Sequence, residues 1–162
     1  MADQNAVLPR DEPIDLHQVP QSAAWLGGLG LIPFVVGSIV VLATEAIWAY
    51  DVLRYYAATI LTFMGGVQWG LAMADAGAAD QHHLLWRRLS LSVVPSLIAW
   101  LALLVSAPFD LIVIAAAFGL LLLSDLSAIR QGWVPAWYAR LRIPLTATVL
   151  VALLLTVWAT AG

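Results

Sequence analysis

The sequence contains no cysteine and no lysine, and only 10% of its 162 residues are charged. Without cysteine the chain forms no disulfide, uses no thiolate nucleophile and builds no Cys-ligated metal site. A soluble domain carries about 25% charged residues, so this chain has too few to cover itself with a water-facing surface. These shortages argue against a soluble enzyme and indicate that most of the surface faces lipid.

Hydrophobic residues make up 62% of the chain, and the mean hydropathy is +0.90. A helix needs about 20 mostly apolar residues to cross a bilayer, and five segments meet that length. The predicted spans are residues 23–44, 52–74, 88–106, 109–129 and 141–160. The predicted fold is an all-α, polytopic bundle of about five transmembrane helices over 23–162, preceded by a flexible cytoplasmic tail over 1–22.

The arginines predict how the bundle is oriented. Five spans place six of the seven arginines on one side of the membrane and only Arg54 on the other. Positively charged loops stay in the cytoplasm, so the N-terminus is expected inside and the C-terminus outside. A basic set made only of arginine suggests a GC-rich bacterial genome, and the predicted location is the bacterial inner membrane.

The second predicted span contains the unusual stretch GGVQWGLAM, residues 65–73. It is not a phosphate-binding loop, because such a loop follows a strand and carries a lysine. Small residues recur at i+4 here, and rows of this kind let transmembrane helices approach closely. The predicted helix-packing row is Thr62, Gly66, Gly70 and Ala74. Its partner is either another helix of this chain or a second subunit.

Two polar groups lie inside predicted spans. Gln68 needs a hydrogen-bond partner in lipid, either on another helix or on a bound ligand, and Trp69 follows it at the inner boundary. Asp125 needs a cation, and Arg142 on the neighbouring antiparallel span suits it better than Arg130, five residues away. The resulting pair either fixes the hairpin or forms a proton or anion site.

The segment GWVPAWYARLR joins the last two predicted spans. Its rings, including Trp137 and Tyr138, are expected to anchor a flat loop at the lipid headgroups. A specific lipid or quinone headgroup pocket is the alternative.

The stretch FMGGVQWGLAM, together with LGGLGLIPF and the segment from Asp125 to Thr146, resembles the transmembrane protein 69 family. The likeness extends from Leu26 to Thr146. It implies a multi-span inner-membrane protein of bacteria or mitochondria and brings no established reaction, cofactor or catalytic residue. The family often has histidine before the tryptophan, whereas this chain has Gln68, so any titrating role of that histidine would be missing.

No catalytic set, metal motif or cofactor is predicted, since the adjacent His82 and His83 do not face one direction on a helix. The favoured hypothesis is a non-enzymatic accessory or assembly subunit that packs against a larger membrane complex. Its expected partners are membrane lipid and other integral membrane proteins or further copies of itself, with no nucleic acid. The alternative is a transporter or a lipid- or quinone-binding protein.

Overall fold

The computed structural model describes residues 19–75, 82–132, 134–135 and 137–161. In these residues the chain forms helices only. They are α1 (Gln21–Thr44), α2 (Ile47–Asp75), α3 (His82–Ala102), α4 (Phe109–Arg130) and α5 (Trp137–Ala161). The predicted helical bundle is confirmed. Most of the predicted tail, residues 1–18, lies outside the described residues.

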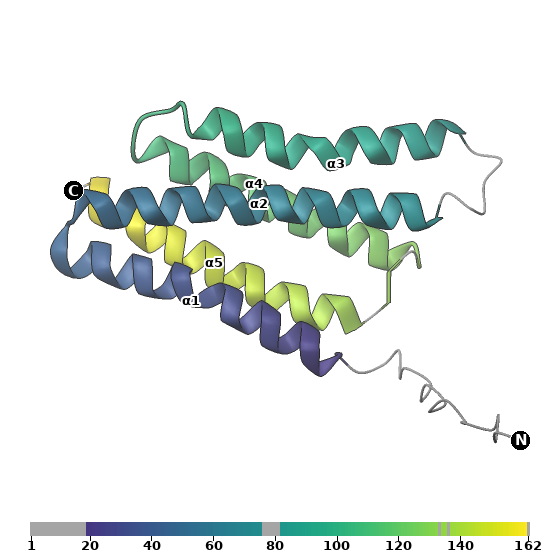
Figure 1. The fold of residues 1–162 in the computed structure, drawn as a ribbon, viewed down its shortest axis with the longest axis horizontal. Coiled ribbons are helices and arrows are strands. Elements are labelled where there is room, and N and C mark those ends of the chain that lie inside the picture. The colour runs from purple at the N-terminus through teal and green to yellow at the C-terminus, as the bar shows by residue number, and fades with distance from the viewer. Residues whose placement is uncertain (1–18, 76–81, 133, 136, 162) are drawn as a thin grey trace, which may run out of the picture.

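Successive helices run in alternating directions, so the start of α1 and the end of α5 lie at opposite ends of the bundle (Figure 1). α2 packs against α1, α3 and α4, while α5 packs against α1 and α4. The starts of α3 and α5 share one end with the end of α4, and these segments contain Arg87, Arg88, Arg130, Arg140 and Arg142. This end is called the arginine end below.

Within the described residues, four helices are long and apolar enough to cross a membrane: α1, α2, α4 and α5. The sequence predicted five spans, and α3 is the one that does not qualify. It begins with two histidines and two arginines and carries three serines, which lowers its apolar character. Nevertheless α3 runs beside α2 along much of its length (Figure 1). A fifth crossing therefore stays a prediction.

Thiol labelling tests that crossing, because the chain has no native cysteine and each introduced one is a unique reporter. We expect Ala79→Cys and Ser106→Cys, which precede and follow α3, to react with an impermeant maleimide from opposite sides of the membrane. Labelling of both from the same side would leave four crossings. The start of α1 and the end of α5 would then lie on the same side of the membrane.

The helix bounds correct one expectation about the arginine end. Trp137 and Tyr138 do not belong to a flat loop, because α5 begins at Trp137, four residues before the predicted start. The Tyr138 backbone N–H donates to the Pro135 carbonyl at 3.0 Å, which closes the first turn. The aromatic rings therefore project from a rigid helix, and α5 has room for a full crossing.

α2 and α3 approach each other closely at Gly65. A Cβ atom added to Gly65 would stand 2.6 Å from the backbone oxygen of Ser92 and 3.5 Å from Cβ of Pro95. Only a residue without a side chain permits this approach. Elsewhere the core is aliphatic and aromatic, with Phe34 of α1 in edge contact with Tyr56 of α2 and Phe118 of α4.

Candidate functional site

Asp125 and Arg142 form the buried ion pair that the sequence predicted. Arg142 Nε donates to Asp125 Oδ2 at 2.7 Å, and the two residues are 7% and 1% exposed. Asp125 lies near the end of α4 and Arg142 on the second turn of α5. The pair therefore joins the two helices of the hairpin. Hydrogen bonds between two charged groups at this distance are stronger than those between neutral groups.

Four more side chains complete this cluster. Gln68 of α2 donates its side-chain amide to Asp125 Oδ1, so the carboxylate is held from two helices. Arg142 Nη1 lies 2.8 Å from the sulfur of Met64, also on α2, which the sequence did not suggest. The Arg142 guanidinium lies 6.0 Å from the centre of the Tyr138 ring, and Tyr138 makes an edge contact with Trp137.

Of the two uses foreseen for Gln68, the interhelical hydrogen bond is present, and its partner is Asp125. Two other candidates are not part of the cluster. Trp69 is 41% exposed and donates to Met73 on its own helix at 2.9 Å. Arg130 is exposed in the last turn of α4. Five of the seven predicted polar residues therefore come together.

The predicted helix-packing row does not pack against the described helices of this chain. Thr62, Gly66, Gly70 and Ala74 are all exposed, and no described atom would lie within 4 Å of a Cβ added to Gly66 or Gly70. The intramolecular form of the prediction is wrong. The row, called the α2 ridge below, forms an open surface on the bundle.

Helix geometry explains the error. An α-helix has 3.6 residues per turn, so each i+4 step drifts by about 40° around the axis. The row that faces the other helices is one residue earlier: Leu53, Ala57, Leu61 and Gly65 are all buried. A shift of one residue turns a helical row by about 100°, which carries the α2 ridge out of the bundle.

A second buried ionic cluster, which the sequence reading missed, lies at the opposite end of the bundle. Asp110 of α4 is fully buried; it accepts from the Tyr50 hydroxyl and pairs with Arg54 Nη1 at 3.3 Å. Arg54 Nε also lies 3.0 Å from Asp51. The available signal was Arg54 near the start of one span and Asp110 at the start of an antiparallel one.

The two clusters act as clamps on the same helix pair. Asp110 and Asp125 are fifteen residues apart on α4, about 22 Å along an ideal helix, and each is bound by α2. The α4 residues that face the core between them are apolar: Leu111, Ile114, Ala115, Ala117, Phe118 and Leu121. On the described core face of α4, apolar packing therefore separates the two ionic clusters.

Long apolar helices with paired charges at their ends define the class of this chain: a helical membrane protein. The model of the family described as protein of unknown function (DUF3429) matches residues 19–158, and the chain belongs to that family. The match includes all five helices but the final residues of α5.

Curated relatives agree with the resemblance seen in the sequence. Transmembrane protein 69 of Xenopus tropicalis is 34% identical over 135 residues, which cover 81% of this chain and 51% of that protein. Transmembrane protein 69 of Mus musculus is 26% identical over 159 residues, covering 94% of this chain and 63% of that protein. The chain thus spans about half to two-thirds of these relatives. No solved structure matches it significantly.

Proposed function

We propose that this chain is a non-enzymatic accessory subunit that packs against another integral membrane protein through the α2 ridge. The observation that carries the proposal is the space beside Gly66 and Gly70, where no described atom lies within 4 Å of an added Cβ. At the neighbouring Gly65, by contrast, α3 occupies the corresponding space. We infer that it lies in a bacterial inner membrane with the arginine end in the cytoplasm, in line with the positive-inside rule.

The bundle supports this role by holding α2 rigidly. The Asp110 cluster fixes the first third of α2, and the Asp125 cluster fixes its last third through Gln68. The α2 ridge runs from the middle of the helix toward the arginine end, with large exposed side chains such as Phe63 and Met73 beside it. A row of small residues between larger ones is the surface that a second transmembrane helix can approach closely.

Replacing Gly66 or Gly70 by leucine is expected to release the partner without damaging the bundle. The new side chain has open space in the isolated chain, so thermal stability in detergent should change little. In the complex it would hold the partner helix away and remove close backbone contacts. Native purification followed by quantitative mass spectrometry of bound membrane proteins measures the loss.

Gly119→Leu is the matched control, because Gly119 of α4 is also open to its surroundings. It should retain the partner. If all three variants retained the partner protein equally, the α2 ridge would not be part of the interface. If the only protein retained were a second copy of this chain, self-association would replace the accessory role.

A further inference from the structure

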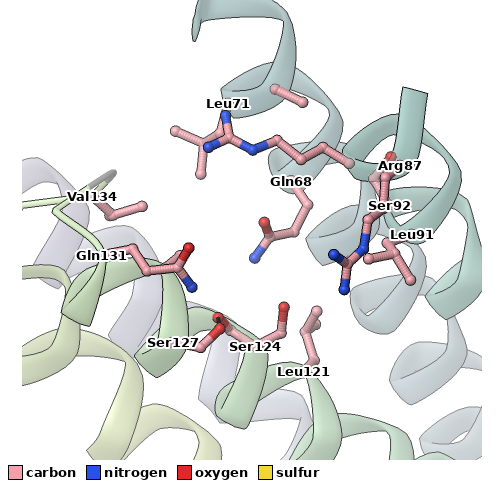
Figure 2. Close-up of a pocket in the computed structure, with 13 residues that line it drawn as sticks. Gln68, Leu71, Arg87, Leu91, Ser92, Leu121, Ser124, Ser127, Gln131 and Val134 are labelled. Atoms are coloured by element: carbon pink, nitrogen blue, oxygen red, sulfur yellow. Dashed lines mark hydrogen bonds between the residues drawn. The ribbon is translucent and has the colours of Figure 1, made fainter. Parts of the chain in front are cut away.

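A pocket of about 240 Å³ lies at the arginine end, between the end of α2, the start of α3 and the end of α4. Figure 2 shows Gln68, Arg87, Ser124 and Gln131 around this hollow. Of its described lining residues, Gln68 is the one that the sequence predicted as a possible ligand contact. The residues that line it are Gln68, Leu71, Ala72, Arg87, Arg88, Leu91, Ser92, Leu121, Ser124, Ser127, Ala128, Gln131 and Val134.

The lining favours an anion. Two arginines contribute guanidinium groups, two glutamines contribute amides, and none of the described lining residues is acidic. Of the three serines, Ser92 and Ser127 donate their hydroxyls to backbone carbonyls of their own helices. Arginine binds phosphate through two parallel N–H donors, which makes it the preferred phosphate ligand in proteins. Asp125, to which the lining residue Gln68 donates, is already paired with Arg142.

The size and the position of the pocket favour a headgroup. Sites that enclose a whole small molecule measure about 300–1,000 Å³, so this pocket holds only a compact group. Its remaining wall is apolar, from Leu71, Ala72, Leu91, Leu121, Ala128 and Val134. The exposed Trp86 directly precedes the two arginines, and exposed tryptophans collect at the headgroup level of a bilayer.

We propose that this pocket binds a compact phosphate headgroup, carried by a membrane lipid whose acyl chains lie outside against the bundle. The site is independent of the α2 ridge, whose residues do not line it. Gln68 connects the pocket to the Asp125–Arg142 pair, because it lines the pocket and donates to Asp125. The bound phosphate would thus contact a residue of the buried clamp.

The test is thermal stabilisation of the full chain in detergent micelles doped with dioleoyl phosphatidic acid, compared with dioleoyl phosphatidylcholine and with inorganic phosphate. Phosphatidic acid should raise the unfolding temperature in a saturable way, and phosphatidylcholine should not. Arg87→Gln should weaken the apparent affinity roughly tenfold, as expected for the loss of one charge-assisted hydrogen bond. If inorganic phosphate stabilised the chain and phosphatidic acid did not, the bound phosphate group would not come from a lipid.

Two further variants keep the test decisive. Ser124→Leu fills the pocket and retains both arginines, so it should abolish saturable binding even if Arg87→Gln folds poorly. Arg130→Gln removes a charge at the same end of the bundle outside the pocket, and it should bind as the parent does. An equal loss of affinity in Arg130→Gln and Arg87→Gln would mean attraction to the charged surface only and would overturn the pocket.

Discussion

Arg142→Leu is expected to lower the free energy of unfolding by about 3–5 kcal/mol, the effect typical of breaking a buried pair from one side. The change leaves the Asp125 carboxylate, which is 1% exposed, with Gln68 as its remaining partner. Asp125→Asn should cost less, because the freed guanidinium still contacts Met64 and Tyr138. Reversible unfolding in mixed micelles measures both.

The double variant Asp125→Asn/Arg142→Leu separates a clamp from an active site. Removing both charges together should recover part of the stability lost in Arg142→Leu, since no uncompensated charge then stays buried. A proton relay or a ligand anchor behaves otherwise: Asp125→Asn would keep the stability of the bundle and lose bound ligand or activity. Purely additive losses in the double variant would contradict the clamp.

Gly65→Ala is expected to have the next largest effect, a loss of about 1–3 kcal/mol from overpacking. The added methyl group would stand 2.6 Å from a backbone oxygen of α3, so a side-chain rotation cannot relieve the clash. α2 and α3 must move apart along their whole contact. The same unfolding assay in micelles detects this loss.

Gly66→Ala provides the adjacent control. It adds the same methyl group one residue later, where no described atom lies within 4 Å. Its stability should equal or slightly exceed that of the parent, because alanine restricts the unfolded chain more than glycine does. Alanine also has the higher helix propensity, so equal losses at both positions would show that the α2–α3 contact at Gly65 does not determine the effect.

The sequence predicted well those features that depend on one helix at a time. Apolar run length placed α1, α2, α4 and α5, with bounds that differ by up to five residues from the observed ones. The Asp125–Arg142 pair was also predictable, because a short hairpin fixes which depths on α4 and α5 face each other.

Features that depend on how one helix is rotated against another were not predictable. The open α2 ridge and the closed Gly65 are neighbours in sequence, and only the packing of α3 distinguishes them. The Asp110 cluster joins residues of α2 and α4 about 60 positions apart. Likewise the phosphate-sized pocket collects side chains from three helices, and no local pattern relates Arg87 to Ser124.

The most direct test of the proposed role is a photo-activatable cross-linker attached to one introduced cysteine, used in native membranes with the full chain. Thr62→Cys places it on the α2 ridge, and Leu120→Cys places it at a similar depth on α4, where the side chain is 63% exposed. We expect position 62 to yield a product containing a different membrane protein, and position 120 to yield none. A product of only twice the 17.4 kDa chain, or the same products from both positions, would contradict an accessory subunit that docks through the α2 ridge.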